Sequence, residues 1–91
     1  MAKKDIFSGS TALVTGASSG LGEEFARELA RRHANLVLTA RSRDKLERLA
    51  ADLARVNGVS VQVIVQDLSE PDGALALARE LKTRGISVDH L

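Results

Sequence analysis

The sequence contains no cysteine, tryptophan or tyrosine, and its only aromatic residues are Phe7 and Phe25. A chain without cysteine forms neither a disulfide framework nor a cysteine-ligated zinc site. This fits a reducing compartment, so we expect a cytoplasmic protein. Two aromatic rings offer no stacking platform for bases, and a net charge of +1 leaves no basic stripe. Nucleic acid is therefore not an expected partner.

Long apolar runs are also missing. None approaches the ~20 residues that a membrane-spanning helix needs, and the two lysines near the amino terminus are not followed by the apolar core of a signal peptide. We therefore expect no association with a membrane. The only histidines, His33 and His90, have no metal-binding partner at short spacing, so we predict no metal site.

What the sequence does contain is a regular change of hydrophobic period. Three short runs are apolar or rich in β-branched residues, which predicts strands buried on both faces at residues 11–15, 36–40 and 60–66. Between these runs, apolar residues recur at helical spacing, which predicts two amphipathic helices. The apolar stripes consist of Leu21, Phe25 and Leu29 in the first helix and of Leu46, Leu49, Leu53 and Val56 in the second.

Turn-forming residues indicate where the helices begin and end. A third helix is predicted to begin near Ser69, a candidate N-cap, because Pro71 is tolerated in a first turn. The first helix has no glycine at its end, so either His33 or Asn35 is expected to adopt the left-handed conformation there. Glycines are expected to end the second and third helices, at Gly58 and Gly85.

The order of these elements predicts the fold class. Strands that alternate with helices form a parallel sheet joined by right-handed crossovers. The last four residues, 88–91, resemble the beginning of a fourth strand. Because the sequence has no linker, repeat or low-complexity tract, we expect residues 1–91 to form a single, partial α/β domain, which ends where a further strand should run.

The junction of the first strand with the first helix reads TGASSGLG, residues 15–22. Glycines allow a tight turn there and a close approach to the backbone, while the first N–H groups of the helix have no partner within it. Hydroxyl donors and the absence of acidic residues before Glu23 favour an anion. The alternative is that the glycines only allow the helix to pack closely on the strand. A nucleotide-binding P-loop is not predicted, because Gly22 is not followed by lysine.

This loop resembles the cofactor loop of the short-chain dehydrogenase/reductase family, Thr-Gly-x-x-x-Gly-x-Gly. Residues 36–41, LVLTAR, are similar to the second strand of that family, and Asp67-Leu68 to its adenine-contacting pair. The resemblance implies a Rossmann-type doubly wound parallel sheet, of which this chain holds three strands, three helices and the start of the fourth strand. It implies that Thr15 braces the first strand against the fourth. The cofactor-binding residues expected from it are Gly16, Ser18, Ser19, Gly20, Leu21, Gly22, Arg41, Ser42, Asp67 and Leu68.

Arg41 indicates which nicotinamide cofactor is used. An NAD site usually places an acidic residue about twenty residues beyond the glycines, where it accepts a hydrogen bond from the ribose 2′-hydroxyl. This chain has Ala40 and Arg41 there, and a guanidinium holds a 2′-phosphate by charge-assisted hydrogen bonds. We therefore predict that NADP(H) is preferred over NAD(H). The simpler alternatives are that Arg41 is a solvated surface residue and that Asp67 is only a turn residue beside Ser69.

Members of the family use a serine, a tyrosine and a lysine for catalysis, and this chain has no tyrosine. The resemblance therefore implies the amino-terminal part of an NADP(H)-dependent oxidoreductase acting on a carbonyl or alcohol substrate. We assign no catalytic residue and expect the chain alone to be inactive. The whole protein is expected to form a homo-oligomer. The alternative is a non-enzymatic nucleotide-binding or interaction module.

Overall fold

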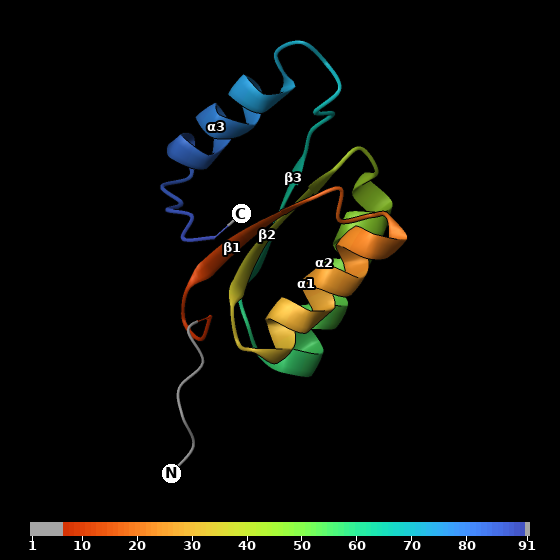
Figure 1. Ribbon diagram of the computed structural model, residues 1–91, viewed down its shortest axis with the longest axis vertical. Helices are drawn as coiled ribbons and strands as arrows, with labels where there is room; N and C mark the ends of the chain where they lie inside the picture. Colours follow the sequence, from red (N-terminus) through yellow and green to blue (C-terminus); the bar gives the residue numbers. More distant parts are fainter. Residues whose placement is uncertain (1–6, 91) are drawn as a thin grey trace.

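The computed structural model describes residues 7–90, and in them three parallel strands alternate with three helices (Figure 1). The sheet has the order β1-β2-β3, with the residues of β1 facing those of β2 in register from Thr11 opposite Asn35 to Thr15 opposite Thr39. The predicted α/β fold is confirmed. The elements are β1 (Thr11–Thr15), α1 (Gly20–Arg31), β2 (Asn35–Ala40), α2 (Arg43–Asn57), β3 (Val61–Val65) and α3 (Gly73–Thr83).

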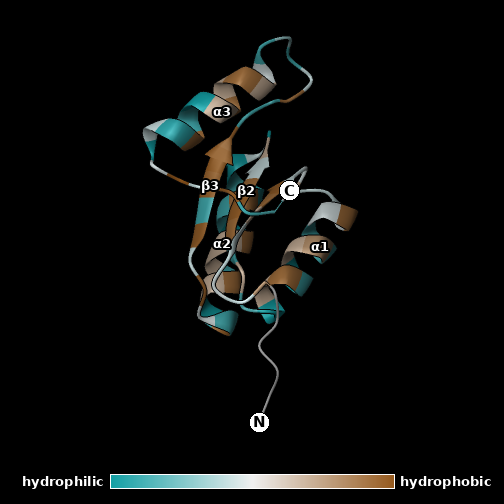
Figure 2. Ribbon diagram, turned by 60° about the vertical axis from the view of Figure 1, so that its left-hand side comes forward, coloured by the Kyte–Doolittle hydropathy of each residue, from teal (hydrophilic) through white to brown (hydrophobic). Residues whose placement is uncertain are grey.

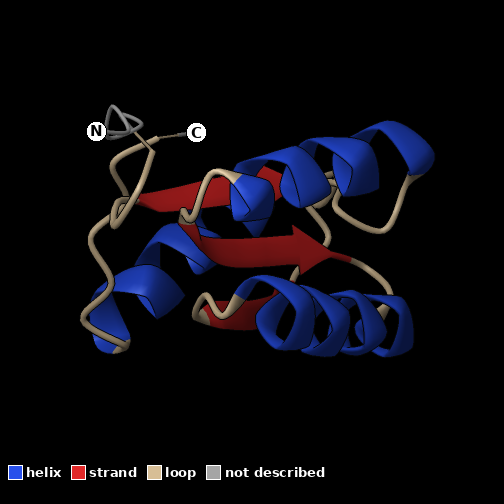
Figure 3. Cartoon of the chain, turned by 90° about the horizontal axis from the view of Figure 1, so that it is seen from below, coloured by secondary structure: helices blue, strands red, loops and turns tan. Residues whose placement is uncertain are grey.

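Helices cover both faces of the sheet, as expected for a doubly wound fold. Helices α1 and α2 lie side by side on one face and α3 lies on the other (Figures 1 and 3). The larger core cluster joins Leu36 and Leu38 of β2 to the buried residues of α1 and α2. The smaller cluster joins Val37 of β2 to Leu77 of α3. Because alternate residues of a strand point to opposite faces, β2 supplies both clusters.

The expectation that all three strands are buried on both faces is wrong for β3. Only Ile64 of this strand is fully buried, and Gln62 is exposed. An edge position alone does not explain this, because β1 lies at the other edge of the described sheet and has three buried residues. Helix α3 covers β3 only in part, through Leu77 and through Arg84, whose guanidinium donates to the Val63 carbonyl at 3.1 Å. Figure 2 shows hydrophobic residues in the strands and, alternating with hydrophilic ones, along the helices.

The predicted apolar stripe of α1 is partly wrong. Leu29 is buried, but Leu21 is 83% exposed and Phe25 is 56% exposed. The residues of α1 that pack on the sheet are instead small, chiefly Ala26 and Ala30, which let the helix lie close to the strands. Leu21 and Phe25 lie beside β1, where they line an apolar groove with strand residues.

The stripe predicted for α2 is correct except at its last residue. Leu46, Leu49 and Leu53 are buried. Val56 is 63% exposed, and the half-buried Asn57 takes the place four residues after Leu53. Its side-chain amide donates to the Leu53 carbonyl at 3.3 Å. Spacings of three and four residues both fit a helical stripe, so the pattern alone could not choose between positions 56 and 57.

The helix ends match the sequence except at the start of α3. His33 has φ of 63°, and Gly58 and Gly85 both have φ of 69°, so these three residues adopt the left-handed conformation. Ser69, however, is not the N-cap of α3, because the helix begins at Gly73. Ser69 instead donates its backbone N–H and its hydroxyl to the Asp67 carboxylate.

The chain returns to the sheet after α3, beside β1. His90 pairs with Ala12 as a parallel bridge, and the His90 carbonyl accepts from the Leu13 N–H at 2.8 Å. The predicted start of a fourth strand next to β1 is thus present at residue 90, while Leu91 and the amino-terminal residues 1–6 lie outside the described residues. No helix in residues 7–90 has the length and apolar character that crossing a bilayer requires.

Candidate functional site

The glycine-rich loop is held in one conformation by its own hydrogen bonds. Gly16 follows β1 with φ of 62°, a conformation that favours glycine. The Ser19 hydroxyl donates to the Gly16 carbonyl at 2.7 Å and accepts from the Gly22 N–H at 3.4 Å, so it caps α1. The Ala17 N–H donates to the Thr39 carbonyl at 3.2 Å, which ties the loop to β2. The amino-terminal end of α1 is therefore fixed beside the ends of two strands.

Gly20 and Gly22 serve different purposes. A Cβ on Gly22 would collide with the Gly16 carbonyl oxygen and lie 3.1 Å from the Ala17 Cα, so close packing of the loop on α1 requires this glycine. A Cβ on Gly20 would meet nothing within 4 Å in the described structure. The packing explanation therefore accounts for Gly22 and leaves Gly20 without a steric reason in the fold. An open backbone at a helix amino terminus suits a ligand that approaches closely.

The carboxyl ends of all three strands meet at a cleft of about 410 Å³. The cleft collects residues that are far apart in the sequence because parallel strands end at the same edge of a sheet. Six of the ten predicted site residues line it: Gly16, Ser18, Ser19, Arg41, Asp67 and Leu68. It is also lined by Thr39, Ala40, Gln66 and Ser69, which the sequence reasoning had not singled out as site residues.

The other four predicted residues lie outside the cleft lining. Leu21 and Gly22 line the apolar groove on the β1 side of α1, a hollow of about 330 Å³ that also contains Phe25. Gly20 lies in the chain between the two hollows, as the first residue of α1. Ser42 is the N-cap residue of α2, and its hydroxyl makes no capping hydrogen bond.

Arg41 is exposed at the end of β2 and lines the cleft. Within residues 7–90, no carboxylate lies within hydrogen-bond or ion-pair distance of its guanidinium. Its charge is nevertheless felt at Asp67, whose pKa it helps to lower. Arg41 is thus a cation on the cleft wall that remains available to an anionic ligand.

Asp67 is organised by the turn that follows β3. Its carboxylate accepts from the Ser69 hydroxyl at 2.6 Å and from the Ser69 N–H at 2.9 Å. These two hydrogen bonds, the hydroxyl first, hold the pKa of Asp67 below its ordinary value, and the charge of Arg41 adds to them. The alternative considered for Asp67, a turn residue beside Ser69, agrees with these hydrogen bonds, and the same residue lines the cleft.

Gly73 supports this turn, and the sequence reasoning missed it. A Cβ there would collide with the Asp67 carbonyl oxygen and lie 2.9 Å from the Leu68 Cα. The glycine therefore lets α3 begin directly against the Asp67-Leu68 backbone. Thr39 was missed as well: it is fully buried, and its hydroxyl has no partner among the described residues. Gln66 could have been found from its position, because it directly follows a parallel strand.

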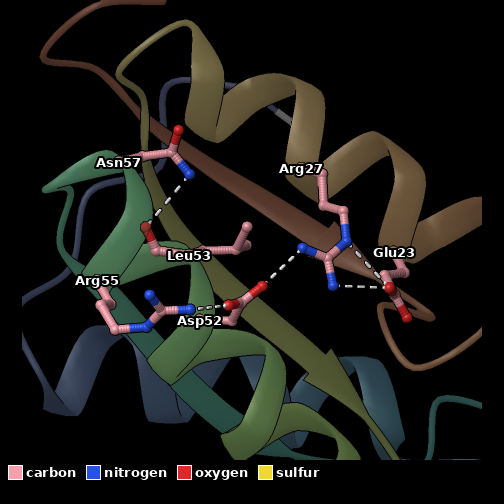
Figure 4. Close-up of polar contacts among 6 residues, drawn as sticks. All are labelled: Glu23, Arg27, Asp52, Leu53, Arg55 and Asn57. Atoms are coloured by element: carbon pink, nitrogen blue, oxygen red, sulfur yellow. Dashed lines mark hydrogen bonds and ion pairs between the residues drawn. The ribbon is translucent and has the colours of Figure 1, made fainter.

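A network of charged side chains joins α1 to α2 next to the glycine loop (Figure 4). Arg27 of α1 contacts Glu23 at 2.9 Å and Asp52 of α2 at 2.8 Å. Asp52 also pairs with Arg55 at 2.7 Å. Hydrogen bonds from Arg27 and Arg55 lower the pKa of Asp52.

Within residues 7–90, no three His, Asp or Glu side chains are grouped so that they could hold a metal ion.

Residues 10–91 match the profile of a protein family described as short chain dehydrogenase. Among curated proteins, the chain is 42% identical over 62 residues to a very-long-chain 3-oxoacyl-CoA reductase of Anas platyrhynchos, covering 68% of this chain and 20% of that protein. It is 39% identical over 83 residues to 11-beta-hydroxysteroid dehydrogenase 1A of Arabidopsis thaliana, covering 91% of this chain and 24% of that protein. The chain thus spans about a fifth to a quarter of the length of these relatives.

Solved structures of dehydrogenases and reductases also match this chain. A short-chain dehydrogenase from Sphingobium yanoikuyae in complex with NADPH matches with a TM-score of 0.74 and 43% identity, over 79% of this chain and 28% of that one. The L-sorbose reductase of Gluconobacter frateurii, complexed with NADPH and L-sorbose, matches with a TM-score of 0.83 and 34% identity. That match covers 91% of this chain and 32% of the reductase.

Proposed function

Since the chain belongs to the short-chain dehydrogenase family, we propose that it is the amino-terminal, cofactor-binding part of an NADP(H)-dependent oxidoreductase. The reaction proposed for the whole protein is hydride transfer between the nicotinamide and a carbonyl or alcohol substrate. The dehydrogenases and reductases named above support this reaction class. They do not favour the alternative, a nucleotide-binding module without catalysis.

The residues of the cleft fit a dinucleotide. We infer that the unpaired N–H groups at the start of α1 and the hydroxyl of Ser18 bind the pyrophosphate, because donors and a positive helix end favour an anion. Ser19 contributes by holding the loop in place, since its hydroxyl donates to the Gly16 carbonyl. The open space at Gly20 admits the phosphates, since a Cβ there would meet no described atom within 4 Å apart from those of its chain neighbours and its own helix backbone. Asp67 and Leu68 are assigned to the adenosine half of the cofactor. When bound, the nicotinamide would supply or accept the hydride.

The observation that carries the choice of NADP(H) is Arg41. It lies at the end of β2, lines the cleft and has no carboxylate partner in residues 7–90. Its neighbour Ala40 offers no acidic group to a ribose 2′-hydroxyl. A guanidinium can hold a phosphate by two parallel hydrogen bonds, whereas a carboxylate at this place would repel it. The NADPH complexes of the Sphingobium and Gluconobacter proteins support the same choice.

The proposal is tested by titrating NADPH and NADH in parallel into the whole protein and comparing the two dissociation constants. One or two charged hydrogen bonds to the 2′-phosphate would make NADPH bind more tightly by about 1.5 to 3 kcal/mol, or roughly 10- to 150-fold. Equal dissociation constants would contradict the assignment of Arg41. We also propose that the whole protein is cytoplasmic and forms a homo-oligomer. Cell fractionation would test its location, and size-exclusion chromatography would test its oligomeric state.

A further inference from the structure

A second groove lies next to the cofactor cleft, between α1 and α2. Its volume is about 490 Å³, and Ser18 of the glycine loop lines both hollows. The groove is lined on the α2 side by Lys45 and Arg48. These two residues are three positions apart on a helix and therefore lie on the same face of it. The cleft and the groove thus meet at Ser18, with Arg41 on one side and the two α2 cations on the other.

The cations of this region fall into two groups. Five arginines in or beside α1 and α2 form an ion pair with a described carboxylate: Arg27, Arg31, Arg32, Arg43 and Arg55. Among the described contacts, Lys45 and Arg48 form no ion pair, and neither does Arg41. The three positive charges without an acidic partner are those that line the cleft and the adjoining groove. Arg27 lines the groove as well, but Glu23 and Asp52 already pair with it, so Lys45 and Arg48 are the cations of the groove that form no ion pair among the described residues.

The acidic residues of the groove do not cancel these charges. Glu23 and Asp52 also line it, but both carboxylates are directed at Arg27, as Figure 4 shows. Asp52 is bound by Arg55 as well, at 2.7 Å. Each carboxylate is therefore already compensated at short range, and Lys45 and Arg48 keep their positive charge toward the groove.

The start of α2 adds a further reason to expect an anion. Cations in the first turn of a helix oppose the helix dipole, and the first turn of α2 holds Arg43 and Lys45 against one acidic residue, Asp44. The hydroxyl of Ser42, the N-cap residue between Arg41 and Lys45, makes no capping hydrogen bond and is free to donate. An anion placed here would interact favourably with these cations and with the helix dipole, and it would accept a hydrogen bond from the Ser42 hydroxyl.

We propose that Lys45 and Arg48 are specificity residues for the cofactor: together with Ser18 they form the outer wall of the site for its ribose 2′-phosphate, opposite Arg41. This inference rests on the proposed function, because it requires an NADP(H) site in the cleft. A phosphomonoester carries a charge of about −1.5 to −2 at neutral pH. The single charge of Arg41, which also acts on Asp67, is not enough to balance it. Lys45 and Arg48 supply the remaining positive charge.

The test compares two probes that differ only in the 2′-phosphate, adenosine 2′,5′-bisphosphate and adenosine 5′-monophosphate, titrated by calorimetry into the chain. We expect Lys45→Gln and Arg48→Gln each to weaken bisphosphate binding by about three- to tenfold and to leave monophosphate binding within about twofold. Lys45→Arg, which keeps the charge, should restore most of the affinity. High salt should reduce the loss, because these side chains are exposed.

Lys82→Gln and Arg79→Gln are the matched controls, because they remove the same charges from exposed positions of α3, on the opposite face of the sheet. A loss in the controls as large as that in the α2 variants would overturn the inference. A second outcome would overturn the inference and leave the proposed function intact. In it, the wild type prefers the bisphosphate and Arg41→Ala removes this preference, but both α2 variants bind like the wild type. If the wild type binds both probes equally, the NADP(H) assignment and this inference fail together.

Discussion

Replacing Gly20 and Gly22 separately by alanine should distinguish the glycine that the fold requires from the glycine that the ligand requires. A Cβ at position 22 would lie 2.8 Å from the Gly16 carbonyl carbon, and it would also collide with the carbonyl oxygen. Carbon atoms in contact prefer separations of about 3.5 to 4.0 Å. The loop and α1 must therefore separate by roughly 1 Å at a contact between two backbones.

The cost of that movement follows from the bonds at Gly16. Its carbonyl oxygen accepts from the Ser19 hydroxyl at 2.7 Å and from the Ser19 N–H at 3.1 Å. Two weakened hydrogen bonds cost about 1 to 3 kcal/mol, and overpacking costs about as much again. We expect Gly22→Ala to lower the free energy of unfolding by about 2 to 6 kcal/mol. That is a large part of the roughly 5 to 14 kcal/mol available to a chain of this length.

Gly20→Ala should have the opposite profile. Its Cβ would enter open space, and alanine is favoured over glycine in a helix by up to about 1 kcal/mol, so stability should stay the same or rise slightly. NADPH binding should weaken by at least about tenfold, because the methyl group occupies the space proposed for the phosphates. Urea denaturation and NADPH titration of both variants measure the two effects. Wild-type stability of Gly22→Ala, or wild-type affinity of Gly20→Ala, would refute this reasoning.

Three further predictions concern the cofactor, catalysis and pH. The double variant Ala40→Asp with Arg41→Ala should reverse the cofactor preference, so that NADH binds more tightly than NADPH in parallel titrations; an unchanged ratio would count against the role of Arg41. The chain itself has no tyrosine and should catalyse no hydride transfer, and NADPH consumption by the purified chain with a panel of carbonyl compounds would contradict this. The folded-state pKa values of Asp52 and Asp67 are lowered, so these two carboxylates stabilise the fold above their ordinary pKa values. That stability is lost as the pH falls through the lowered values. Urea midpoints should therefore fall in acid, and less steeply in Asp52→Asn.

The strand and helix order could be predicted because each element carries its own local signal. Residues 11–15, TALVT, are almost wholly apolar or β-branched and form β1 with those same bounds. Gly58 and Gly85 mark helix ends because the left-handed conformation excludes most other residues, and His33 was one of two candidates for the same reason. Local conformational preference decides these positions, so a single sequence is enough to find them.

Burial was harder to predict because it depends on neighbours that are remote in the sequence. The α1 pattern correctly grouped Leu21 and Phe25 with Leu29, but only Leu29 faces the described core. The periodicity of a helix reports which residues share a face and does not report what lies opposite that face. For the same reason β3 and β2 looked alike in the sequence, while the structure places β3 at an edge.

The candidate site shows the same division between local and remote information. The family resemblance assigned ten residues to the cofactor, and six of them line one cleft because the carboxyl ends of parallel strands share an edge. Gly73 could not be assigned in this way, because its role depends on how closely α3 approaches the backbone of Asp67 and Leu68.

Ser69 shows how one side chain can be assigned to the wrong neighbour. Serine shortly before a proline in a first turn is typical of an N-cap, and the sequence alone did not show that Asp67 would compete for the serine. In the structure, the Asp67 carboxylate takes both the hydroxyl and the N–H of Ser69 at 2.6 and 2.9 Å. A charged acceptor two residues away forms stronger hydrogen bonds than the backbone of a helix that has not yet begun. The turn that results places Asp67 on the cleft wall within the field of Arg41, so the serine that was expected to start a helix instead shapes the candidate site.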